Sequence, residues 1–178
     1  HERRDLVRLE RRVSDDDTAA QYFRARFVPE AGRAGTWRVI CRHLARYVPE
    51  TARVLDLGAG YCSFINAVQA GEKHALDANP GFVEFAAPGV HTHVGRCHSL
   101  LAFPAAHFDV VFASNLLEHL AGRELAETIC EVRRVLRPGG IAVLPVPMVS
   151  PHTVEYPEPN RYDDWHWRAP GPDYFDRY

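Results

Sequence analysis

Residues 54–64 have the sequence Val54-Leu55-Asp56-Leu57-Gly58-Ala59-Gly60-Tyr61-Cys62-Ser63-Phe64. A short apolar run, typical of a buried strand, leads into two glycines separated by one residue and then into an amphipathic stretch. Gly58 and Gly60 allow a tight turn and let a ligand approach where a Cβ atom would collide. Asp56 needs a hydrogen-bonding task, because burying an unpartnered carboxyl group is costly. We therefore predict a strand, a ligand-binding loop and a helix; a plain strand-to-helix turn is the alternative.

The same alternation of strand and helix continues along the chain. Short apolar or β-branched runs, each followed by a helix-like stretch, lie at residues 54–57, 74–77, 91–94, 109–113 and 141–145. Strands separated by helices favour a parallel sheet with right-handed crossovers. The fold class expected is α/β, with a doubly wound parallel sheet.

The chain divides into three regions. Residues 1–48 are expected to form an amino-terminal helical cap, with one helix starting near Ser14 and a lead-in helix over residues 34–48. Residues 49–148 form the core, whose best-defined helix runs from Arg123 to Leu136 and is ended by Pro138-Gly139-Gly140. Residues 149–178 form an aromatic-rich tail in which no further strand is expected.

Composition excludes several classes of partner. The formal charge is −2, Lys73 is the sole lysine, and acidic residues interleave with most of the arginines, so nucleic acid is not expected. No apolar run approaches the roughly 20 residues that span a bilayer, so no membrane partner is expected either. Together these features predict a cytoplasmic protein.

Cysteine and histidine spacing does not suggest a metal. The four cysteines are far apart and form no CxxC pair, which predicts buried free thiols. His91 and His93 alternate in a predicted strand, and elsewhere no HxH or HxxxH pair is joined by a carboxylate at ligand spacing. No metal site is therefore expected.

An acidic residue ends the second predicted strand. Asp77 follows Gly60 by 17 positions, and in a βαβ unit such a residue lies where it can accept hydrogen bonds from both hydroxyls of a ribose. The alternatives are a solvated loop residue or a helix N-cap near Asn79. Ser63 occupies the place where the dinucleotide fingerprint has Gly or Ala, which argues against a nicotinamide dinucleotide.

Four motifs resemble, in sequence and spacing, those of class I S-adenosylmethionine-dependent methyltransferases. They are the Asp-x-Gly-x-Gly loop at 56–60, Asp77, the segment FDVVFASNLLEHL at 108–120 and the segment RVLRPGG at 134–140. The resemblance covers about residues 50–147. It implies a Rossmann-like sheet of order 3-2-1-4-5 and S-adenosylmethionine as cofactor.

The resemblance also implies roles for individual residues. The backbone of Gly58, Ala59 and Gly60 would cradle the methionyl group, and Asp56 would support its amino group. Asp77, next to Ala78, would hold the ribose hydroxyls, and Asn115 would flank the sulfonium.

The chain departs from the family pattern after the third strand. Many members place an acid there to bind the adenine amino group, whereas this chain reads Gly95-Arg96-Cys97-His98-Ser99. Adenine contacts are then expected from the backbone of Cys97 and His98 or from the Ser99 hydroxyl. Phe82 and Leu100 could sandwich the ring, although core packing is the favoured role for both.

The chain also departs from the pattern at its end. The family fold continues past the fifth strand with a helix and an antiparallel hairpin, but only 31 residues follow Pro147. The final strands are therefore expected to be missing. Either the chain is shortened, or its fifth strand is an exposed edge that something else covers. Residues 160–178 resemble the substrate-side insert of some small-molecule methyltransferases.

Catalysis and acceptor binding are assigned to two regions. His119 and Glu118 are the candidate bases, with His152 and His166 as weaker candidates; alternatively, Glu118 and His119 cap the next helix or hydrogen-bond the loop. Four aromatic residues are predicted to line the acceptor site as a lid: Tyr22, Trp165, Trp167 and Tyr174. Packing of the tail on the sheet edge is the alternative.

These observations predict methyl transfer from S-adenosylmethionine to an oxygen or nitrogen of a small-molecule acceptor by in-line displacement. A non-catalytic cofactor-binding or assembly protein and an NAD(P)-dependent oxidoreductase remain as alternatives. The expected partners are the acceptor and, as an open option, a second copy of the chain in a homodimer.

Overall fold

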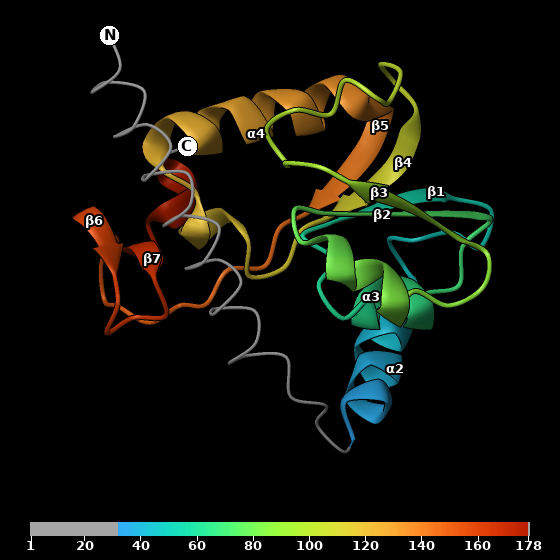
Figure 1. Ribbon diagram of the computed structural model, residues 1–178, viewed down its shortest axis with the longest axis horizontal. Coiled ribbons are helices and arrows are strands. Elements are labelled where there is room, and N and C mark those ends of the chain that lie inside the picture. Colours follow the sequence, from blue (N-terminus) through green and yellow to red (C-terminus); the bar gives the residue numbers. More distant parts are fainter. Residues whose placement is uncertain (1–31, 178) are drawn as a thin grey trace, which may run out of the picture. The chain divides into compact units, whose positions relative to one another are not determined.

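The computed structural model describes residues 32–177, and in this part of the chain it contains a five-stranded parallel sheet (Figure 1). The strands are β1 (Arg53–Leu57), β2 (Glu72–Asp77), β3 (Val90–Val94), β4 (Phe108–Phe112) and β5 (Leu136–Val143). Their order is β3-β2-β1-β4-β5. The expected strand order and α/β class are confirmed.

Helices cover both faces of the sheet (Figure 1). They are α2 (Arg33–Leu44), α3 (Ser63–Ala67) and α4 (Gly122–Val135), with short 3-10 helices η1 (Pro80–Phe85), η2 (Leu117–His119) and η3 (Tyr174–Asp176). Side chains of β1 alternate between the two faces: Val54 packs in the cluster with α2 and α3, and Leu55 and Leu57 pack in the cluster with α4. A strand buried on both faces explains the apolar run in the sequence.

The boundary between α4 and β5 differs from the prediction. The helix ends at Val135, and Pro138-Gly139-Gly140, expected to lie before the strand, falls inside β5. The pairing register between β4 and β5 shifts between Phe108 and Val110, which accommodates this irregular stretch. Ile141 is 39% exposed, and β5 is an edge of the sheet.

The prediction of no strand after Pro147 is wrong. Strands β6 (Val154–Asn160) and β7 (His166–Ala169) form an antiparallel pair that is separate from the main sheet. Pro157 and Pro159 obscured β6 in the sequence, because proline cannot donate a ladder hydrogen bond. A two-stranded sheet tolerates them, since each strand has an unpaired side.

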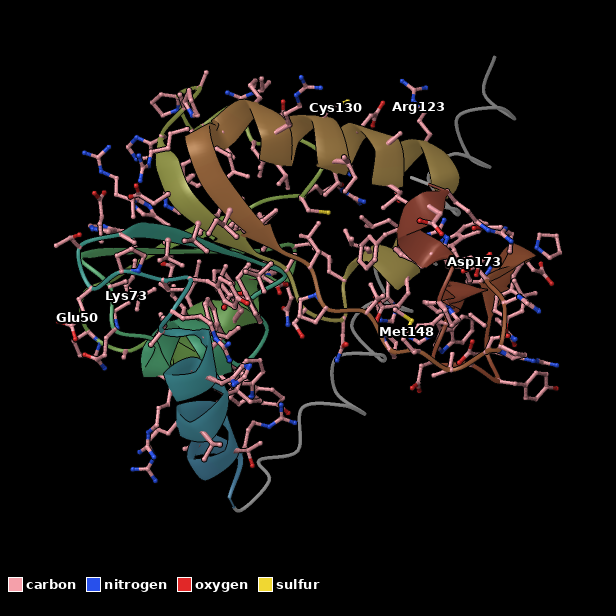
Figure 2. The ribbon with its side chains drawn as sticks, turned by 180° about the vertical axis from the view of Figure 1, so that it is seen from behind. Glu50, Lys73, Arg123, Cys130, Met148 and Asp173 are labelled. Atoms are coloured by element: carbon pink, nitrogen blue, oxygen red, sulfur yellow. The ribbon has the colours of Figure 1, made fainter. Side chains whose placement is uncertain are left out.

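The cysteines are free, as predicted, but they are not all buried. Cys41, Cys62 and Cys97 are buried, whereas Cys130 is exposed on the outer surface of α4 (Figure 2). Burial raises the pKa of Cys41 to about 11 and that of Cys62 to about 12, so both thiols stay protonated near neutral pH.

Two further expectations concern the beginning of the chain and its relation to membranes. The helix expected near Ser14 and the acceptor residue Tyr22 lie outside the described residues. Within residues 32–177, every helix is too short or too polar to cross a bilayer.

Candidate functional site

The loop after β1 has the conformation that its glycines predicted. Gly58 and Gly60 have φ values of +67° and +49°, a region that side chains disfavour. A Cβ atom on Gly58 would lie 3.1 Å from Cδ1 of Leu116. The N–H groups of Gly58 and Ala59 donate to the carbonyl oxygen of Leu76 at 2.8 and 3.1 Å. The loop is thus held at the carboxyl end of β2, which brings it next to Asp77.

Asp77 organises this loop. Its Oδ2 accepts from the N–H of Gly60 at 2.9 Å, and its Oδ1 accepts from the N–H of Asn79 at 2.8 Å. Burial raises the pKa of the Asp77 carboxyl, and these N–H donors oppose the rise. Each carboxylate oxygen keeps lone-pair capacity for a hydroxyl donor. The N-cap of η1 is Asn79, so Asp77 is neither that cap nor a solvated loop residue.

Asp56 is buried in β1 beneath the same loop, with a relative exposure of 3%. Burial raises its pKa well above the ordinary value of 3.8, the Ile65 N–H that hydrogen-bonds to it opposes the rise, and the charge of Asp77 adds to it. The expected hydrogen-bonding task of Asp56 is therefore present. Two carboxyl groups close to a glycine-lined turn suit a cationic ligand that also carries hydroxyls.

Asn115 lies just beyond the carboxyl end of β4. It is exposed, has a φ of +51°, and donates its N–H to the carbonyl oxygen of Pro145 at 3.1 Å. Asparagine tolerates this left-handed conformation better than most residues. The main-chain bond joins the segments that follow β4 and β5, and it leaves the Asn115 side chain at the edge of the sheet where the glycine loop also lies.

Side chains of the segment predicted to contact adenine are largely engaged in contacts within the protein. Cys97 is buried, and the Thr128 hydroxyl donates to its Sγ at 3.5 Å. Nδ1 of His98 lies 3.9 Å from Oε1 of Glu124. Phe82 and Leu100 are fully buried in the two core clusters, which agrees with the packing role that the sequence favoured.

A carboxyl group and two imidazoles meet at the turn after β4. Ligand atoms of Glu118, His119 and His166 lie within 4.8 Å of one another. The rings of His119 and His166 have centroids 4.5 Å apart and cross at 77°. The N-cap of α4 is Ala121, without a side-chain cap, so neither Glu118 nor His119 caps that helix. This group could transfer a proton or hold a cation.

Arg168 of β7 places His166, and sequence reasoning missed it. The guanidinium, only 1% exposed, donates from Nη1 to the carbonyl oxygen of Leu117 in η2 at 2.8 Å. Its Nε donates to both carboxylate oxygens of Glu155 in β6 at 3.1 Å. Arg168 therefore attaches the hairpin to the turn that carries His119. In a strand, His166 and Arg168 lie on the same face, which could have linked Arg168 to His166. The sequence did not predict a strand there, so this signal was not recognised.

The aromatic residues of the tail have different environments. Tyr174 is 1% exposed and packs with Leu117, Leu120 and Leu125, so its ring serves the core and does not line an acceptor site. Trp165 is 44% exposed, and Trp167 is half-buried. His152 is exposed and is not part of the group around His119.

Comparison with known proteins places this chain among methyltransferases. Residues 55–144 match the family model described as a methyltransferase domain. An uncharacterized methyltransferase of Mycolicibacterium gilvum is 36% identical over an alignment of 98 residues, and the match covers 51% of this chain and 37% of that protein. The match therefore spans little more than a third of that relative.

Solved structures agree in fold. A chain from the Haloferax volcanii complex of the Trm112 methyltransferase activator with a methyltransferase is 26% identical, with a TM-score of 0.53 over 61% of this chain and 51% of that one. A SAM-dependent methyltransferase from Archaeoglobus fulgidus is 17% identical, with a TM-score of 0.61 over 81% and 66% of the two chains.

Proposed function

This chain belongs to the S-adenosylmethionine-dependent class I methyltransferases, and from that premise we propose that it transfers a methyl group to an oxygen or nitrogen of a small-molecule acceptor. Membership of this family favours methyl transfer over the hydride transfer of a nicotinamide-dependent oxidoreductase. One observation carries the proposal: the glycine-lined turn after β1 is closed by the carboxylate of Asp77.

The residues present fit the family's cofactor. A Cβ atom on Gly58 would lie 3.1 Å from Cδ1 of Leu116 and would strain the left-handed turn, so a glycine suits a loop that offers its backbone to a ligand. Asp77 offers acceptors for two ribose hydroxyls. Asp56 offers a carboxyl whose ionised form an adjacent ammonium group would stabilise.

When bound, S-adenosylmethionine supplies an electrophilic methyl group on a sulfonium. The protein has to hold the acceptor atom about 3 to 3.5 Å from that methyl, in line with the bond that breaks. Asp77 and the glycine loop fix the position of the donor. Asn115, at the same sheet edge, is the residue we assign to the sulfonium side.

His119 is the base we propose for acceptors that must lose a proton. A neutral imidazole takes the proton from a hydroxyl or ammonium group as the new bond forms. Glu118 and His166, whose ligand atoms lie within 4.8 Å of His119, would stabilise the imidazolium. Trp165 and Trp167 of the hairpin would cover a flat or apolar acceptor.

Calorimetric titration with S-adenosylhomocysteine tests cofactor binding. We expect saturable binding to the wild-type chain, with affinity lowered at least about tenfold in Asp77→Asn, because one hydroxyl acceptor is lost. Asp176→Asn changes an exposed carboxyl of η3 and should bind normally. Equal affinity in Asp77→Asn and the wild type would refute the site.

Transfer of labelled methyl groups to a panel of phenols, alcohols and amines tests the reaction. We expect His119→Ala to lower kcat about 10²- to 10⁴-fold for an acceptor that must be deprotonated, with unchanged S-adenosylhomocysteine affinity. His152→Ala is the matched control. Cofactor binding without transfer to any acceptor would favour the non-catalytic alternative.

Two further proposals concern the oligomeric state and the location of the protein. A homodimer, which sedimentation velocity would detect, remains open because β5 presents an exposed edge. The cytoplasmic location remains an expectation from composition.

A further inference from the structure

Histidines that are dispersed in the sequence gather on β2 and β3. In the parallel register His74 lies opposite His91, and Leu76 lies opposite His93. Because alternate residues of a strand share a face, Glu72 and His74 of β2 project to the same side of the sheet as His91 and His93 of β3. Leu76, on the same side, packs in the cluster that contains α4 residues. A Glu-x-His pair thus lies beside a His-x-His pair.

The side chains of this cluster are in contact. Nε2 of His74 lies 2.8 Å from Oε1 of Glu72, and its Nδ1 lies 3.1 Å from Nε2 of His93. The rings of His74 and His91 stack with centroids 4.8 Å apart. One ligand atom each from Glu72, His74 and His91 lies within 4.8 Å of the others.

We propose that Glu72, His74 and His91 bind a divalent transition-metal cation of the zinc class. Two imidazoles and a carboxylate are the donors that zinc takes from proteins. His74 is buried and His91 is exposed, so the site is anchored on its inner side and open to water on its outer side. Water would complete the coordination sphere, as at three-ligand zinc sites.

Neighbouring polar groups contact the proposed metal ligands and orient their side chains. With Nε2 of His74 on the metal, its Nδ1–H donates to His93, which fixes the tautomer and orientation of the ring. Nε of Arg53 lies 3.1 Å from Oε2 of Glu72, which directs the other oxygen toward His74.

The metal site lies away from the cofactor site. Glu72 and His74 are near the amino end of β2, whereas the glycine loop lies at the carboxyl ends of the strands. Figure 2 shows Lys73, between the two ligands, at the opposite end of the sheet from Met148, which follows β5. β3 is an edge strand and is mostly exposed. The cation would therefore attach an edge strand to its neighbour and take no part in methyl transfer.

Zinc titration of the untagged, chelator-treated 178-residue chain tests this proposal. We expect saturable binding that His91→Ala and Glu72→Gln each weaken about tenfold or more, because each removes a ligand. Both side chains are at least partly exposed, so both variants should fold, which circular dichroism checks. His43→Ala, on the exposed surface of α2, should leave the affinity unchanged.

The group around His119 could also take up zinc, so all titrations are repeated in a His119→Ala background. Retention of the tight site in that background, together with its loss in His91→Ala, supports the assignment. Absence of saturable binding, or affinity unaffected by both His91→Ala and Glu72→Gln, overturns it. Neither result depends on S-adenosylhomocysteine binding, so this proposal and the proposed function fail separately.

Discussion

Asp56 contributes a carboxyl group to the proposed cofactor site but lowers the stability of the folded protein. Its carboxyl is buried next to Asp77, and burial is the main cause of its raised pKa. The pKa of Asp56 is raised above 3.8 in the folded protein. As the pH rises from 3.8 toward that raised pKa, the unfolded chain ionises first, so the folded state loses stability. The unliganded protein is therefore destabilised by Asp56 at neutral pH.

We expect Asp56→Asn to raise the free energy of unfolding at neutral pH by about 1–2 kcal/mol. Asparagine keeps an oxygen for the N–H of Ile65 but carries no charge. The gain should vanish below about pH 3, where Asp56 is protonated in both states. Urea unfolding at both pH values measures it, with Asp176→Asn as the control. An equal loss of stability at both pH values would contradict the argument.

Gly58 supports a second prediction at a single residue. Gly58→Ala adds a Cβ atom at φ +67°, 3.1 Å from Leu116, and should cost about 1–3 kcal/mol and weaken S-adenosylhomocysteine binding. Gly122→Ala, where the added atom meets nothing within 4 Å, should be nearly neutral. Leu116→Ala removes the side chain that the new Cβ atom meets but also core packing, so the double variant should lose less stability than the sum of the losses in the two single variants.

At the scale of elements, the attachment of the hairpin to η2 connects the tail with catalysis. We expect Arg168→Met to retain much of the buried volume but to lose the bond to Leu117, at a cost of about 1–3 kcal/mol. Amide hydrogen exchange over residues 154–169 should accelerate. The value of kcat should fall, because His166 and the two hairpin tryptophans lose their position, while S-adenosylhomocysteine affinity should hold.

Arg177→Met provides the matched control for that variant. Arg177 pairs with Asp173 near the surface, and such pairs contribute about 0–1 kcal/mol. If Arg168→Met lowered cofactor affinity as strongly as it lowered kcat, the hairpin would belong to the cofactor site and would not be a separate acceptor-side element.

At the scale of the whole molecule, the two proposed sites lie at opposite ends of the parallel strands. Zinc at the amino end of β2 and S-adenosylhomocysteine at the carboxyl ends of the strands should stabilise the protein additively, within about 0.5 kcal/mol. Thermal unfolding with each ligand and with both measures the coupling. A larger interaction free energy would show that β2 transmits strain between its ends.

Local patterns in the sequence determined the core of this protein. The apolar strand before Gly58, the helix over residues 122–135 and the acid at Asp77 each depend on neighbours a few positions away, so periodicity and turn chemistry sufficed to predict them. The methyltransferase motifs lie in these same segments, and for that reason the family was recognisable from sequence.

Tertiary structure alone decided which distant side chains meet. Glu72 and His74 reach His91 only through the register of β2 and β3, and Arg168 reaches Leu117 across 51 positions of chain. It also placed the ring of Tyr174 in the core, where the sequence suggested a lid. Such contacts are set by the packing of whole elements, and no local spacing in the chain encodes them.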